Sequence, residues 1–95
     1  MQGKNRDLDA SIQFCIEFRK YCETVDAQAK QLMAVAQSAE PVLRDEVGRE
    51  AINRVYEFCH HVIRIVYQGE ARILVLEKRY RQIRDELEEI RGRSR

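Results

Sequence analysis

One heptad pattern of apolar residues runs along residues 52–90 for more than five repeats. Such a pattern is typical of helices that pack along their length. It therefore predicts an all-α protein with a long helix, and it indicates a shape rather than a reaction. Apolar side chains recur at alternating steps of three and four, with a single glycine among them: Ile52, Val55, Cys59, Val62, Val66, Gly69, Ile73, Leu76, Tyr80, Ile83, Leu87 and Ile90.

A second heptad stripe precedes the first and predicts a helix over about residues 7–37. Ser38 is a good helix N-cap, and Pro41 is tolerated in the first turn of a helix. We therefore expect a turn at about 38–41 and a second helix over about 42–91, as an antiparallel hairpin within a single helical domain of residues 1–95. The basic tail 92–95 is expected to be disordered. The second stripe comprises Leu8, Cys15, Phe18, Cys22, Val25, Ala29, Leu32 and Ala36.

The position of this turn sets which residues face each other. A fold at residues 38–39 places Leu8 opposite Gly69, so that Ile73–Ile90 overhangs the first helix by about 25 Å. Either the second helix is continuous and its overhang packs on another chain, or it breaks near 67–70 and residues 71–91 form a third helix. A glycine inside a helix costs only about 1 kcal/mol. Since the heptad phase also passes through Gly69 unchanged, the pattern favours the continuous helix.

The segment from Val55 to Leu76 is apolar over more of its circumference than a two-helix contact needs. Such a helix is typical of a bundle of three or more helices. A chain of 95 residues also leaves much of its surface unburied as a lone hairpin. We therefore expect coiled-coil-like packing, completed as a four-helix bundle in a homodimer or with a different helical partner. The predicted partner-binding residues are Tyr56, Phe58, Ile63, Ile65, Tyr67, Ile73, Leu74, Leu76, Tyr80, Ile83, Leu87 and Ile90.

The sequence has few candidates for chemistry. Cys15 and Cys22 are one heptad apart, and the predicted register places Cys59 between their levels. A soft-metal or redox site is one interpretation, but without Cys-x-x-Cys pairs three small core residues are favoured. His60 and His61 point about 100° apart on a helix and are expected in solvent or at an interface rim. Because no catalytic, cofactor-binding or metal-binding motif is found, we expect a protein that is not an enzyme and has no cofactor or small-molecule substrate.

The charge balance gives little indication of a nucleic-acid partner. The net charge is +1, so no global field attracts anions. The arginines near the C-terminus are interrupted by acidic residues, and an association with nucleic acid is the third hypothesis. We predict no membrane span and no secretory signal, and hence a cytoplasmic protein, with secretion by a signal-independent route left open.

The length, the helical hairpin and the wide central stripe resemble the WXG100, or ESAT-6-like, family. Residues 45–51 occupy the hairpin end where that family carries Trp-x-Gly, although this chain contains no Trp. The family's C-terminal Tyr-x-x-x-Asp/Glu signal is also absent, because Tyr80 is followed four residues later by Arg84. The resemblance implies a dimeric partner or chaperone of a larger toxin secreted by the type VII route. We expect first an interaction module, and second such a secretion partner.

Overall fold

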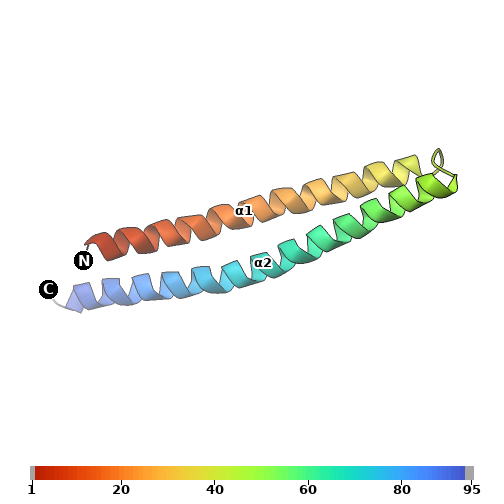
Figure 1. The fold of residues 1–95 in the computed structure, drawn as a ribbon. Helices are drawn as coiled ribbons and strands as arrows, with labels where there is room; N and C mark the ends of the chain where they lie inside the picture. The colour runs from red at the N-terminus through yellow and green to blue at the C-terminus, as the bar shows by residue number, and fades with distance from the viewer. Residues whose placement is uncertain (1, 94–95) are drawn as a thin grey trace. The chain divides into compact units, whose positions relative to one another are not determined.

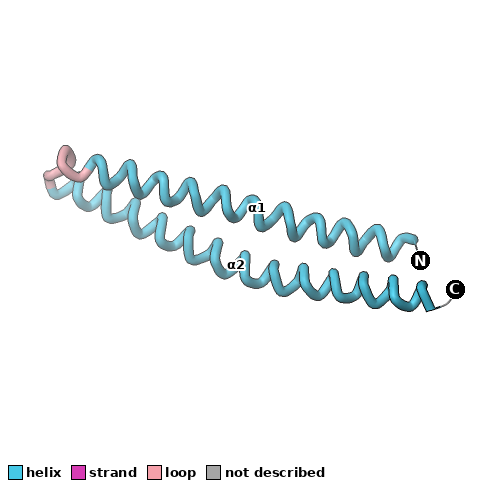
Figure 2. Tube along the Cα trace, turned by 180° about the vertical axis from the view of Figure 1, so that it is seen from behind, coloured by secondary structure: helices cyan, strands magenta, loops and turns pink. Residues whose placement is uncertain are grey.

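The described residues form two long helices joined by one loop. The structure, a computed structural model, describes residues 2–93, with side chains from residue 6 onward. Helix α1 spans Gln2–Ala39 and helix α2 spans Glu46–Arg93 (Figure 1). The loop of residues 40–45 connects them (Figure 2). The predicted all-α hairpin with a longer second helix is confirmed.

The helix bounds differ from the predicted ones at both ends. Helix α1 begins five residues earlier than predicted, and the connection is longer. Helix α2 passes through Gly69 without a break, so the structure has the continuous helix of the two alternatives. Of the predicted tail, Gly92 and Arg93 belong to α2, whereas Ser94 and Arg95 lie outside the described residues. Neither helix has a stretch long and apolar enough to cross a membrane within the part of the chain described.

Pro41 ends the first helix rather than starting the second. A residue before proline avoids the helical conformation, so α1 stops at Ala39. The backbone N–H groups of Val42 and Leu43 then donate to the Ala39 carbonyl at 3.0 and 2.9 Å. Ser38 is not the N-cap that the sequence predicts, because its hydroxyl donates to the Ala34 carbonyl within α1.

Asp45 is the N-cap of α2. Its carboxylate Oδ1 accepts a hydrogen bond from the Gly48 N–H at 3.1 Å, which satisfies one of the free donors of the first turn. Gly48 is needed for a close approach: a Cβ there would lie 2.6 Å from that Oδ1 atom and 2.8 Å from the Leu43 Cβ. The loop therefore packs directly onto the start of α2.

The chain divides into two compact units. Unit 1 comprises residues 1–20 and 70–95, and unit 2 comprises residues 21–69. In unit 2 the two helices lie side by side next to the loop (Figures 1 and 2). In unit 1 the Arg19 Nη2 atom lies 2.7 Å from the Glu77 Oε1 atom, and Arg84 Nη1 lies 3.3 Å from Asp9 Oδ1. Each unit thus contains a segment of α1 paired with one of α2.

The ion pairs of unit 1 show that the predicted overhang is wrong. Residues 70–93 of α2 pack with the beginning of α1 in the same chain, so Ile73–Ile90 has a partner helix. The predicted register fails because α2 starts at Glu46 and its first turns are covered by the loop rather than by α1. The hydrogen bond between Glu40 and Tyr56 places the end of α1 beside the third turn of α2.

Candidate functional site

The seam between the helices of unit 2 is filled by small side chains. Cys59 is fully buried, and the other buried apolar residues of this unit follow the same heptad spacing. Its phenylalanine, tyrosine and leucine side chains all lie outside this buried set. The two helices of unit 2 therefore bury little apolar volume against each other. The buried apolar residues of unit 2 are Cys22, Ala29, Ala36, Ile52, Cys59 and Val66.

Larger apolar side chains gather on one side of this seam. In a hairpin of two right-handed helices, positions three residues after the buried ones lie on one side, and positions four residues after lie on the other. Glu40 follows the buried Ala36 by four residues, and Tyr56 follows the buried Ile52 by four residues. The hydrogen bond between them shows that these positions of the two helices lie together on the second side. The first side is apolar, and we call it the apolar face: Val25, Leu32, Val35, Val55, Phe58, Val62 and Ile65.

The apolar face is open to solvent. Phe58 and Val35 are each 60% exposed, Ile65 is 53% exposed and Leu32 is 40% exposed. Fully burying a side chain of this kind is worth about 1.5–3 kcal/mol. A contiguous set of such residues at helical spacing is therefore a surface suited to packing against other helices.

The opposite side of unit 2 is polar. The Tyr56 hydroxyl donates to the Glu40 carboxylate at 2.5 Å, and this hydrogen bond raises the pKa of Tyr56 above its ordinary 10.0. The Lys30 ammonium lies 2.8 Å from Asp26, which raises the pKa of Lys30 through a hydrogen bond and through its charge. Tyr67 contributes in the same direction and so lies near Lys30. The pairs on this side distinguish it from the apolar face.

The structure separates the predicted partner-binding residues of unit 2 into two groups. Phe58 and Ile65 lie on the apolar face. Tyr56 and Ile63 are half-buried on the polar side, and Tyr67 is exposed near Lys30. The predicted set therefore mixes both sides of α2.

Sequence reasoning missed the contribution of α1 to this surface. The second heptad stripe includes Leu32 and omits Val35, yet both are exposed on the same side as Phe58 and Ile65. A usable signal exists, because Phe14, Tyr21 and Val35 share one heptad position on the flank of the second stripe. All three are exposed.

Four of the predicted residues of unit 1 lie beside α1 of the same chain: Leu76, Tyr80, Ile83 and Leu87. Leu76 and Tyr80 line an open hollow of about 470 Å³ together with Phe14. Tyr80, Ile83 and Leu87 line a second hollow of about 390 Å³. Ile73 is half-buried, Leu74 is 38% exposed, and Ile90 is 61% exposed.

Unit 1 contains a buried carboxylate that the sequence pattern did not indicate. Glu77 lies outside the heptad pattern of apolar residues, yet it is only 5% exposed. Arg19 donates from Nε and Nη2 to its Oε1 atom at 3.0 and 2.7 Å, and Arg81 donates from Nε to Oε2 at 3.0 Å. Burial favours the neutral acid, but the hydrogen bonds and charges of Arg81 and Arg19 outweigh it and lower the pKa of Glu77.

The three cysteines do not form the predicted single layer. Starting from the contact between Glu40 and Tyr56, Cys22 and Cys59 lie on levels that differ by about 20 Å along unit 2. All three cysteines are buried, and none of them forms a disulfide. Burial raises the pKa of Cys15 above its ordinary 9.0, Glu77 raises it further, and Arg19 acts in the opposite direction. Among the described residues, no group of three His, Cys, Asp or Glu side chains is placed to hold a metal ion.

The remaining charged candidates are exposed or ion-paired. His60 and His61 are both exposed. In the arginine-rich end of α2, Arg81 pairs with Glu77, Arg84 pairs with Asp9 and Arg93 pairs with Glu89. These pairs reduce the positive charge available for phosphate groups.

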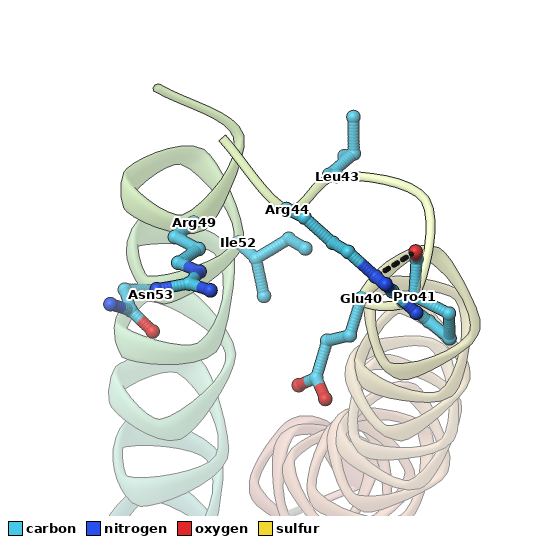
Figure 3. A pocket seen from close by; sticks show the side chains of 7 residues that line it. All are labelled: Glu40, Pro41, Leu43, Arg44, Arg49, Ile52 and Asn53. Carbon is cyan, nitrogen blue, oxygen red and sulfur yellow. Dashed lines mark hydrogen bonds between the residues drawn. The ribbon is translucent and has the colours of Figure 1, made fainter. Parts of the chain in front are cut away.

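The loop forms an open hollow at the start of α2. Figure 3 shows Ile52 pointing from α2 toward the loop, while the Arg44 Nε atom donates to the Pro41 carbonyl at 2.8 Å. Arg49 and the Glu40 carboxylate line the same hollow. The lining thus carries charges of both signs, and the hollow is a consequence of how the loop covers α2.

Comparison of the chain with protein-family models, with curated proteins and with solved structures finds no match.

Proposed function

We propose that the protein is a non-enzymatic interaction module that associates with a second copy of itself by packing helices on the apolar face of unit 2. The observation that carries this proposal is the reversed distribution of side-chain size. The seam holds cysteine, alanine, valine and isoleucine, while Phe58, Ile65 and Leu32 are left exposed. A folded chain normally buries its largest apolar residues.

The accessible surface supports a second copy as the partner. The chain exposes 7818 Å², whereas a folded monomer of 11.3 kDa is expected to expose roughly 5,700 Å². The excess is about 2,000 Å². A stable interface of standard size covers about 800 Å² of each partner, so the excess is sufficient for one.

Thermal unfolding tests this proposal. The melting temperature of a self-associating chain rises with protein concentration, because association stabilises only the folded state. Phe58→Glu should remove this dependence, since it places a charge in the apolar face. Val42→Glu is the matched control: Val42 is 81% exposed in the loop, outside the face, and its replacement should leave the dependence intact.

A melting temperature that is independent of concentration in the unmodified chain would contradict the proposal. So would a Phe58→Glu variant that behaves like the Val42→Glu control. If the chain unfolds cooperatively only when a different helical protein is bound, the apolar face binds that protein and not a second copy.

A second candidate is a secretion partner of the WXG100 type. The support is architectural, because α1 and α2 form a helical hairpin with a loop of only residues 40–45. Co-expression with a large toxin encoded beside this protein should then give a stable complex. An unrelated gene neighbourhood, or no complex with such a toxin, would count against this candidate.

A further inference from the structure

Glu77 is the one charged side chain that is buried among the described residues. Its Oε1 atom accepts two hydrogen bonds from Arg19 of α1, and its Oε2 atom accepts one from Arg81 of α2. Arg81 moves together with Glu77, because both belong to α2. Only the contact with Arg19 therefore depends on how far α1 is shifted along α2.

The loop limits this shift but does not determine it. Glu46 precedes Tyr56, the partner of Glu40, by ten residues, so α2 begins about 15 Å beyond the level of Glu40. A shift of one heptad would change this span to about 25 Å or to about 5 Å. The six residue steps from Glu40 to Glu46 reach about 21 Å at most. The loop thus excludes the longer span and permits the shorter one, which we call the shifted register.

The contacts around the loop permit the shifted register as well. The Asp45 cap and the approach of Leu43 to Gly48 lie within the loop and α2, so they move with α2. Opposite Glu40, Arg49 would take the place of Tyr56, because it precedes Tyr56 by seven residues. A polar partner for the Glu40 carboxylate would therefore remain.

The buried seam does not distinguish the two registers at two of its positions. In the shifted register Cys15 would take the place of Cys22, and Ala29 would take the place of Ala36. Identical side chains would fill these places, because the stripe on α1 repeats every seven residues.

We infer that Glu77 is a positioning residue, whose hydrogen bonds with Arg19 select the register of the hairpin. In the shifted register Ile12 would replace Arg19 opposite Glu77, because it precedes Arg19 by seven residues. The buried carboxylate would then lose both hydrogen bonds from α1. Loss of one partner of a buried charge is strongly unfavourable. Buried polar residues fix the register of coiled coils in the same way.

Distances within the full chain test this inference. Spin-labelled non-natural amino acids at Glu17 on α1 and Glu88 on α2, both exposed in unit 1, leave the native cysteines unlabelled. Dilution with unlabelled chain restricts pulsed electron paramagnetic resonance to distances within one chain. The unmodified protein should give one distance. Glu77→Ile should add a second distance that is longer by about 5–10 Å, because the shift moves the two labels about 10 Å farther apart along the helices.

Two further variants complete the test. Ile12→Arg combined with Arg19→Ile moves the arginine by one heptad and should convert the whole population to the longer distance. Glu50→Ile removes an exposed ion pair with Arg54 within α2 and should keep the original distance.

An unchanged single distance in Glu77→Ile, or in the exchange of positions 12 and 19, would overturn the inference. A second distance in Glu50→Ile would also overturn it, because loss of any carboxylate on α2 would then suffice. If Glu77→Ile fails to fold, the exchange variant alone decides.

Discussion

Replacing Gly48 by alanine tests the close approach of the loop to α2. Alanine is normally favoured over glycine within a helix by about 1 kcal/mol, so helix propensity alone predicts stabilisation. Here the added Cβ would lie 2.8 Å from the Leu43 Cβ and 3.2 Å from the Leu43 carbonyl carbon. The loop backbone must move to relieve these contacts. The structure therefore predicts the opposite sign.

The size of the effect follows from the two interactions that the movement disturbs. Loss of an aspartate N-cap costs about 0.5–2 kcal/mol, and an extra methyl group in a packed site costs about 1–3 kcal/mol. After the gain in helix propensity, a net loss of about 2 kcal/mol in the free energy of unfolding is expected. For a domain of this size, that corresponds to a melting temperature lower by about 10 °C.

The assay is thermal unfolding followed by circular dichroism at fixed protein concentration. Gly92→Ala is the matched control, because no atom lies within 4 Å of a Cβ built at Gly92 in the last turn of α2. That variant should be as stable as the unmodified chain or more stable by up to about 1 kcal/mol. If Gly48→Ala melts at or above the temperature of the unmodified chain, the described packing of Leu43 on α2 is wrong.

Two further predictions concern unit 1. Because the folded state lowers the pKa of Glu77 below its ordinary 4.5, its ion pairs contribute stability above that pH and lose it as the pH falls through the folded value. The difference in melting temperature between the unmodified chain and Glu77→Gln should therefore be largest at neutral pH and shrink below about pH 4.5. A difference that stays constant from neutral to acid pH would show that the ion pairs of Glu77 do not stabilise the fold. The second prediction concerns the thiols of Cys15 and Cys59, which are fully buried. Burial also raises the pKa of Cys15 and so keeps its thiol protonated. Iodoacetamide should therefore modify neither residue until the chain unfolds, and peptide mass spectrometry can measure this. Rapid modification of Cys15 under native conditions would show that the helices of unit 1 separate and expose this thiol.

The heptad period was sufficient to predict the helices and much of their buried seam. Cys15, Cys22 and Ala29 recur at seven-residue spacing in the sequence and are buried in the structure. Ile52 and Cys59 do the same on α2. Such a period fixes which side of a helix is buried, because residues seven apart share a side. It does not fix how far one helix is shifted along the other.

The register depended on the turn, and the turn signals were ambiguous. Ser38 and Pro41 are found at helix starts, but here they mark the end of α1. The true N-cap, Asp45, lacks the glutamate three residues later that makes a start recognisable, since Gly48 occupies that position. The resulting shift produced an overhang that the structure does not contain. It also concealed Glu77, whose partner Arg19 is adjacent only in the correct register.

The apolar face could be predicted only in part. Phe58 and Ile65 stand out in the sequence as apolar residues beyond the stripe, so their exposure could be expected. Leu32 and Val35 join them only once the sides of the two helices are assigned by contacts such as that of Glu40 with Tyr56. Size patterns on a single helix cannot provide that assignment, because it depends on the other helix.

The mass of the unmodified chain in solution tests self-association most directly. Light scattering coupled to size-exclusion chromatography, from micromolar to millimolar concentration, gives this mass independently of molecular shape. We expect a species of twice the 11.3 kDa of one chain, which Phe58→Glu converts to a single chain. A mass of 11.3 kDa at every concentration, together with cooperative unfolding, would contradict it.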